Sequence, residues 1–220
     1  MSNLIAELQK DVLSDKPLNN CLRKCVVLGG QLGSVELREW ASRELRGYDD
    51  LDFLPPYRRV LAPLMISGMN VRLRYTGHQI TRAAIPESMR EYVPEDLSLM
   101  HGIGEIEAMV SNATDGSLRM GHPGFPNIVQ YWNHELGSYE SVTELYWLVS
   151  VSALQGVIDQ VRTTLAELVA ELDAGTPRGE ELPPLELATQ AVHVAGNGAK
   201  SRVTVTSAQA GGGSQSSVCT

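Results

Sequence analysis

The chain has 220 residues, of which 43% are hydrophobic and 20% charged, and its net charge is −8. This composition supplies enough apolar side chains for a sizeable core and excludes a chain that is disordered over most of its length. The most apolar stretch without charge, between Glu144 and Asp159, is shorter than the roughly 20 residues of a membrane-spanning helix, so we expect no membrane span and no membrane partner. The odd number of cysteines and the absence of a signal-peptide pattern favour a reducing, cytoplasmic location.

Three short helices are predicted at the start of the chain. Apolar residues at three- and four-residue steps indicate helices over about residues 3–14 and 17–28, and Gly29-Gly30 and Gly33 are expected to end the second. Ser34 is a suitable N-cap for the third helix. Gly47 is placed to end that helix in a left-handed conformation.

The middle of the chain is predicted to hold a small antiparallel element and one helix. Val71–Tyr75 alternates apolar with polar residues, which indicates a strand, and Thr76-Gly77 is suited to turn it into a second strand over about 79–85. A helix over about 97–112 should follow. The segment 115–126 is rich in glycine and proline and is expected to lack regular structure.

The strongest periodic signal predicts one long helix from about residue 140 to 173. Such a helix would be about 50 Å long at 1.5 Å per residue. Its apolar residues step alternately by four and three, as in a coiled-coil seam: Trp147, Val151, Leu154, Ile158, Val161, Leu165, Leu168 and Leu172. Either this seam packs on helices of the same chain, or its end self-associates with a second copy or contacts a partner protein, through Val161, Leu165, Leu168 and Leu172.

The last part of the chain is predicted to be separable. Gly175 should end the long helix, which gives a domain over residues 1–175 followed by a linker and tail over 176–220. Valines on both sides of Gly196-Asn197-Gly198 indicate a short hairpin over about 192–205, and 207–220 offers little to bury. The predicted fold class is therefore α+β and mostly helical, with an N-terminal three-helix segment, a small antiparallel strand element and a long C-terminal helix with a coiled-coil-like seam.

No familiar catalytic motif is present. The sequence lacks a phosphate-binding glycine loop, a nucleophile elbow and a zinc-binding histidine pair, so we expect no cofactor and no metal. The acidic cluster Asp49, Asp50 and Asp52 is either a divalent-cation site or a solvated turn, and its spacing matches no calcium loop. The five histidines are scattered through unlike contexts.

Arginines gather in one window of this acidic chain. Residues 57–93 hold six arginines and two glutamates, a net charge of +4 by count. These arginines either bind an anion or ligand or pair internally with acidic side chains. Because the whole chain is acidic, we expect no nucleic-acid partner. The candidate anion- or ligand-binding residues are Arg58, Arg59, Arg72, Arg74 and Arg82, with Arg72 and Arg74 on one strand face.

Two motifs follow the middle of the third expected helix. The first, led by Trp40, is Glu44-Leu45-x-Gly47-Tyr48, and the second is Leu54-Pro55-Pro56-Tyr57-Arg58. Further motifs are Leu4-Ile5-x-Glu7-Leu8-x-x-Asp11, Leu22-Arg23-Lys24, and Val161-Arg162-x-x-Leu165 with Glu167–Leu172. With these motifs, residues 3 to about 174 resemble the AbiTii family, a module of bacterial anti-phage conflict systems. The residues that carry the resemblance best are Glu44, Gly47, Tyr48, Tyr57 and Arg58.

The chemistry of these residues favours a structural role. Gly47 should cap a helix, Trp40 and Tyr57 should be core aromatics, and Arg58 should bond carbonyls or carboxylates around Tyr48. The resemblance implies a component of a bacterial antiviral system of the abortive-infection type. We expect a non-enzymatic sensing, scaffolding or assembly module. The alternatives are a toxin with metal-dependent hydrolase or nuclease activity, helped by Asp49–Asp52 or Glu135, and a small-ligand sensor at the arginines.

Overall fold

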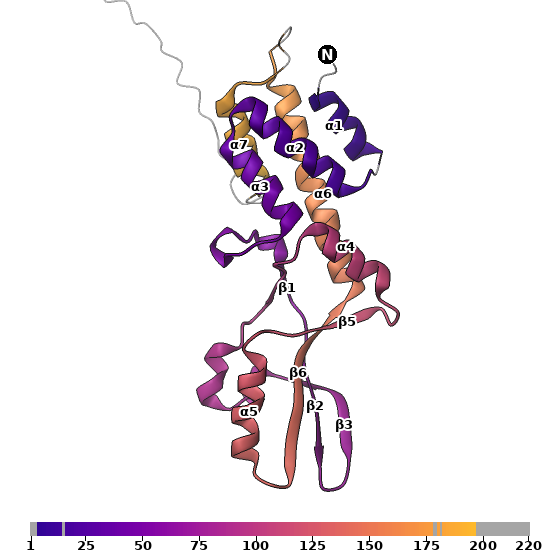
Figure 1. Cartoon of the computed structure of the whole chain (residues 1–220), viewed down its shortest axis with the longest axis vertical. Helices are drawn as coiled ribbons and strands as arrows, with labels where there is room; N and C mark the ends of the chain where they lie inside the picture. Colours follow the sequence, from indigo (N-terminus) through magenta and orange to yellow (C-terminus); the bar gives the residue numbers. More distant parts are fainter. Residues whose placement is uncertain (1–3, 15, 178–179, 181, 197–220) are drawn as a thin grey trace, which may run out of the picture.

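The computed structural model describes residues 4–14, 16–177, 180 and 182–196, and these form two lobes along one long axis (Figure 1). The helical lobe holds α1 (Leu4–Leu13), α2 (Leu18–Leu32), α3 (Val35–Arg46), α4 (Ile103–Asn112), α6 (Val151–Ala174) and α7 (Leu185–Gly196). The sheet lobe holds β2 (Leu64–Asn70), β3 (Arg74–Ile80), β5 (Ser117–Met120), α5 (Phe125–Leu136) and β6 (Glu140–Ser150). The fold class is α+β, as predicted.

A narrow neck joins the two lobes. Its centre is a two-stranded antiparallel pair of β1 (Arg59–Val60) with β4 (Leu97–Ser98). Two short 3-10 helices, η1 (Leu51–Phe53) and η2 (Pro56–Arg58), lead from α3 into β1. Two more, η3 (Arg82–Ala84) and η4 (Glu87–Tyr92), follow β3.

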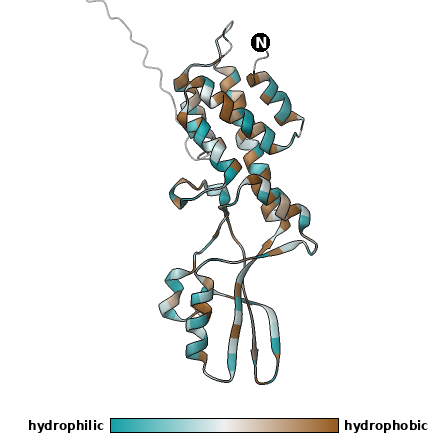
Figure 2. Cartoon of the chain, viewed as in Figure 1, coloured by the Kyte–Doolittle hydropathy of each residue, from teal (hydrophilic) through white to brown (hydrophobic). Residues whose placement is uncertain are grey.

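The helical lobe begins with the three predicted helices. The Ser34 hydroxyl caps α3 by accepting a hydrogen bond of 3.2 Å from the Leu37 N–H. The glycine pair at 29–30 does not end α2, which continues to Leu32 and stops at Gly33 with φ of 72°. The reason is close helix packing, since a Cβ on Gly29 would lie 2.8 Å from the backbone nitrogen of Arg38. Figure 2 shows hydrophobic and hydrophilic residues alternating along these helices.

The long C-terminal helix is shorter than predicted. Residues 140–150 form strand β6, and α6 covers only Val151–Ala174, or about 36 Å at 1.5 Å per residue. Trp147 therefore lies in the sheet, where its ring packs on Phe125 at 4.7 Å between centroids. The change of structure occurs at Ser150, whose hydroxyl caps α6 by accepting from the Ala153 N–H at 3.2 Å.

The remaining seam residues pack inside the chain. Helix α6 packs against α1, α4 and α7. Val161, Leu165, Leu168 and Leu172 are all fully buried in a single copy. This arrangement matches the first of the two alternatives, in which the seam packs on helices of its own chain.

The sheet has the strand order β3-β2-β6-β5, and all neighbours are antiparallel. The strand expected at Val71–Tyr75 begins only at Arg74, because the β2–β3 turn occupies Val71–Leu73. Asn70 makes that turn, since its side-chain oxygen accepts from the N–H groups of Arg72 and Leu73 at 2.9 and 3.0 Å. Gly77 lies within β3 rather than at a turn. The expected second strand over 79–85 is likewise replaced by the end of β3 and by η3.

Two further segments differ from the predictions. The helix expected over 97–112 begins only at Ile103, and 97–98 is strand β4. The segment 115–126 contains β5 and the start of α5, which carries Pro126 in its first turn, where a missing N–H costs nothing.

The end of the described chain is helical. Residues 192–194, expected as a strand, belong to α7, which packs on α6 and α3 and buries Ala188 and Ala191. The rest of the expected hairpin and the segment 207–220 lie outside the described residues. Among the described residues, none of the helices combines the length and apolarity needed to cross a bilayer.

Candidate functional site

The motif residues form one buried polar network at the C-terminal end of α3. Glu44 and Arg58 are both 0% exposed, and the Arg58 Nη2 group forms an ion pair with Glu44 Oε2. The hydroxyls of Tyr48 and Tyr57 donate to Glu44 Oε1 at 2.6 and 2.8 Å. The Trp40 indole N–H donates to the Tyr57 oxygen at 3.3 Å. We call these five residues, Trp40, Glu44, Tyr48, Tyr57 and Arg58, the α3 network.

The α3 network holds the neck to the helical lobe. Arg58 lies just before β1, and its Nη1 group donates to the carbonyls of His101 at 2.6 Å and Leu99 at 3.4 Å, just after β4. The bonding expected for Arg58 is therefore observed. A single buried cation thus connects α3 with the start of β1 and with the segment that leads into α4, two of the chain segments that join the lobes.

Gly47 allows this close approach. It ends α3 with φ of 97° and ψ of 173°, a positive φ outside the left-handed helical region. It forms a β-bridge with His101, and the Tyr48 N–H donates to the Met100 carbonyl at 2.7 Å. A Cβ on Gly47 would lie 2.5 Å from the Met100 oxygen. The motif glycine is required by backbone contact.

Burial keeps the network phenols protonated. Burial raises the pKa of the Tyr48 phenol, and the adjacent Glu44 carboxylate raises it further. The pKa of Tyr57 is raised by the same two causes in the same order. Both phenols therefore act as donors to the carboxylate at physiological pH.

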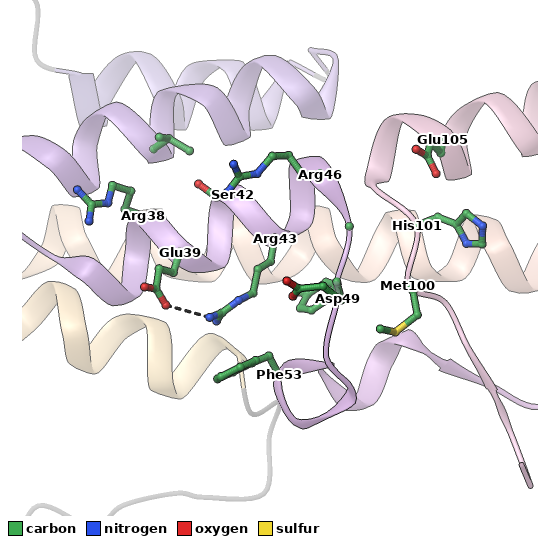
Figure 3. Close-up of a pocket in the computed structure, with 13 residues that line it drawn as sticks. Arg38, Glu39, Ser42, Arg43, Arg46, Asp49, Phe53, Met100, His101 and Glu105 are labelled. Carbon is green, nitrogen blue, oxygen red and sulfur yellow. Dashed lines mark hydrogen bonds and ion pairs between the residues drawn. The ribbon is translucent and has the colours of Figure 1, made fainter.

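A cleft of about 850 Å³ lies on the outer face of α3, beside the network (Figure 3). We call it the α3 cleft. Its walls come from α2, α3, the segment after α3, the segment that leads into α4 and the first turn of α4. Its lining residues are Val26, Arg38, Glu39, Ser42, Arg43, Arg46, Gly47, Tyr48, Asp49, Phe53, Met100, His101 and Glu105.

The arginines of the cleft fall into two groups. Arg43 is occupied, because it pairs with Glu39 at 3.0 Å and its guanidinium lies 4.0 Å from the centre of the Phe53 ring. Arg38 and Arg46 are exposed and lie one turn on either side of Ser42 along α3. Among the described residues, neither guanidinium has a hydrogen bond or an ion pair. These two cations are available to an anion.

The parts of the cleft that face α3 carry acceptors and an imidazole. Figure 3 shows Asp49 on the segment after α3, His101 on the segment leading into α4 and Glu105 in the first turn of α4. The cleft therefore presents arginines along α3, with carboxylates beside them at Glu39 and on the facing segments at Asp49 and Glu105. A second hollow, of about 460 Å³, shares Glu39, Arg43 and Phe53 with it and extends to His193 of α7.

The arginines singled out from the sequence are not brought together. Arg58 belongs to the α3 network, Arg59 pairs with Asp96 at 3.7 Å, and Arg82 pairs with Glu95 at 2.9 Å. These three follow the internal-pairing alternative. Arg72 and Arg74 lie at the β2–β3 turn, at the end of the sheet lobe farthest from the helical lobe. They do not share a strand face, since Arg72 is in the turn.

The acidic cluster forms part of a turn. Asp50 caps η1, because its side chain accepts from the Asp52 N–H at 2.9 Å, and Asp49 lines the α3 cleft. Within the described ranges, the structure contains no group of three or more histidine, cysteine or acidic side chains that could hold a metal ion.

Sequence reasoning missed the cleft arginines. The spacing of Arg38, Ser42 and Arg46 at four-residue steps was visible and places them on one helix face. That spacing is also usual for a helix face that is simply exposed to solvent. What makes this face part of a cleft is the opposite wall, supplied by Met100–Glu105, which is distant in sequence.

A profile of the AbiTii family matches residues 3–196, a range that spans all of the described residues. The chain belongs to the AbiTii family. The family name indicates an abortive-infection, anti-phage system. The AbiTii match includes α7, some twenty residues beyond the region that carried the motifs. No curated protein and no solved structure matches this AbiTii chain.

Proposed function

We propose that this AbiTii chain is a cytoplasmic sensing module of anti-phage defence and that it binds a small anionic ligand in the α3 cleft. The observation that carries the proposal is the pair of unpartnered arginines, Arg38 and Arg46, on either side of Ser42 in a cleft of about 850 Å³. Ligand sites usually have volumes of about 300–1,000 Å³. The cleft therefore has the size and the charge for a small phosphorylated molecule.

The side chains that line the cleft favour a ligand with two kinds of group. Guanidinium groups bind phosphate oxygens in pairs of parallel hydrogen bonds, so Arg38 and Arg46 suit a phosphate. Asp49 and Glu105 accept hydrogen bonds, which suits amino groups on another part of the ligand. A nucleotide carries both kinds of group.

The position of the cleft supports sensing. Gly47, Tyr48 and His101 line the cleft and also hold the neck on the helical lobe. A ligand that contacts α3 and the segment leading into α4 would therefore stabilise the contact that joins the two lobes. Binding at the cleft would in this way change the stability of the neck.

Thermal unfolding tests this proposal. The full chain is unfolded with inorganic phosphate, nucleoside mono- and triphosphates, and cyclic dinucleotides. A ligand at 100 times its Kd adds about 2.7 kcal/mol, which is roughly a 5–10 °C rise in Tm for a chain of this size. The rise should disappear in the R38A/R46A variant. The K10A/K16A variant, which removes the same charge at exposed positions elsewhere, should keep it.

Two outcomes would overturn the proposal. The first is that no probe raises the Tm of the full chain. The second is that the purified protein cleaves RNA, DNA or nucleotides with Mg²⁺ or Mn²⁺, which would favour a toxin instead.

Assembly with a second copy or with a partner protein of the same system remains part of the proposal. It is no longer assigned to Val161, Leu165, Leu168 and Leu172, because these side chains are buried in the single copy. Light scattering, with and without the ligand, measures the mass of the particles in solution and so detects such assembly.

A further inference from the structure

Two turns lie together at the end of the sheet lobe farthest from the helical lobe (Figure 1). One is the β2–β3 turn at Val71–Leu73, and the other joins α5 to β6 at Gly137–Tyr139. Both line one shallow hollow of about 240 Å³. We call this end of the molecule the tip. It comprises Met69, Val71, Arg72, Leu73, Arg74 and Tyr139.

The tip exposes large apolar side chains. Tyr139 is 77% exposed, Val71 is 72% exposed and Leu73 is 55% exposed. The turn does not need them, because Asn70 fixes it with side-chain and backbone hydrogen bonds, including one of 2.9 Å from its N–H to the Leu73 carbonyl. Turns of this kind usually carry small or polar residues. These apolar side chains therefore serve something other than the fold.

The same turn is basic. Residues 61–86 contain no aspartate or glutamate, and Arg72 and Arg74 alternate with Val71 and Leu73. Among the described residues, neither guanidinium has a hydrogen bond or ion pair. The facing turn is flanked by Glu135 of α5 and Glu140 of β6, so the positive charge is concentrated on the β2–β3 side.

We propose that the tip inserts shallowly into the surface of an anionic lipid bilayer. Val71, Leu73 and Met69 would enter the boundary between headgroups and acyl chains. Tyr139 would lie at the interface, where tyrosine is enriched. Arg72 and Arg74 would reach lipid phosphates, as basic residues next to an apolar contact do. No membrane-spanning segment is needed for such contact.

The size and shape of the tip favour lipid over a protein partner. A stable protein interface uses about 20–30 residues on each side, whereas the tip offers six at a protruding end. The net charge of −8 opposes binding only over short distances, because the Debye length is about 8 Å at physiological ionic strength. The tip lies at one end of the long axis, away from the acidic helical lobe.

Vesicle co-sedimentation of the full chain tests the proposal. Vesicles of phosphatidylcholine with a quarter phosphatidylglycerol are compared with vesicles of phosphatidylcholine alone. We expect binding to the anionic vesicles. Because each arginine near an anionic surface contributes about 1 kcal/mol, R72A/R74A should weaken it about 30-fold. V71S/L73S should also lose binding to anionic vesicles.

The matched control is L13S/L61S, which removes two exposed leucines far from the tip and should bind as the unaltered chain does. R38A/R46A should also bind normally, since the tip does not depend on the α3 cleft. The Tm of each variant shows that it is folded. The proposal is overturned if the unaltered chain does not sediment with anionic vesicles, if the tip variants bind as well as the control, or if the tip instead captures a protein in the absence of lipid.

Discussion

The two faces of α3 contrast sharply in what their charged residues do. On the inner face, Glu44 is fully buried and has three partner side chains, Tyr48, Tyr57 and Arg58. On the outer face, Arg38 and Arg46 line an open cleft without a side-chain partner among the described residues. The family-like motif lies on the inner face. The part of AbiTii that its motifs identify is therefore the attachment of the neck, whereas the candidate ligand site is beside it.

The largest expected effect is on the inner face. Glu44→Ala leaves Arg58 buried without its counter-ion, and breaking a buried pair costs about 3–5 kcal/mol. Glu39→Ala, five residues earlier on the outer face, breaks an exposed pair with Arg43 and should cost at most about 1 kcal/mol. Urea unfolding measures both. Equal losses in the free energy of unfolding would mean that the ion pair on the inner face stabilises the chain no more than the one on the outer face.

Removal of α7 should have the next largest effect. A chain ending at residue 175 loses the helix that packs on α6 and α3 and buries Ala188 and Ala191. We expect a loss of about 2–4 kcal/mol from the newly exposed apolar surface. A chain ending at 196 retains every described contact and should unfold as the full chain does. If the chain ending at 175 is equally stable, the domain ends there, as the sequence suggested.

Gly47 tests the contact between α3 and the neck. Gly47→Ala should cost about 1–3 kcal/mol, because φ is 97° and the new Cβ would meet the Met100 carbonyl. Gly116→Ala is the control, since φ is 68° there but no atom lies within 4 Å of the added Cβ. Denaturation should show the larger loss at Gly47. A larger loss at Gly116 would mean that the Met100 contact is unimportant.

The smallest effect is a pH dependence that belongs to the inner face alone. Because burial raises the pKa of Tyr48, its stabilising contribution is complete below the unfolded pKa of about 10 and is lost as pH rises above it. Above about pH 10 the unfolded chain releases a proton that the folded chain retains, so the free energy of unfolding falls by about 1.4 kcal/mol per pH unit. Tyr48→Phe should make this fall shallower, whereas the control Tyr139→Phe, at the exposed tip, should not. An unchanged slope in Tyr48→Phe would contradict the burial of this phenol.

Local signals in the sequence located the N-terminal helices. The apolar spacing of α1 and α2 and the Ser34 cap act within one or two turns, so they can be read from neighbouring residues. Gly33 ends α2 as expected, whereas the pair at 29–30 lies inside the helix, because Gly29 is required by contact with Arg38 on another helix.

Non-local pairing explains the other failures. The seam spacing runs through Trp147 into Val151 without a break, yet β6 is a strand because it pairs with β2 on one side and β5 on the other. Leu64–Ser67 is buried on both faces and so shows no alternation, which hid β2. Charge counting likewise found Arg58 but not its partner, because Glu44 lies outside the counted window.

The helical lobe is assembled from separate parts of the chain, which has a consequence for its synthesis. α1 packs against α6, and roughly 140 residues separate the two. At about 5–20 residues per second, a ribosome takes roughly 7 to 28 s to make the intervening chain. For that time Ile5, Leu8 and Val12 can pack only on α2 and lack the part of their covering surface that α6 supplies in the finished molecule. The first helix is therefore fully packed only after roughly 140 further residues have been made.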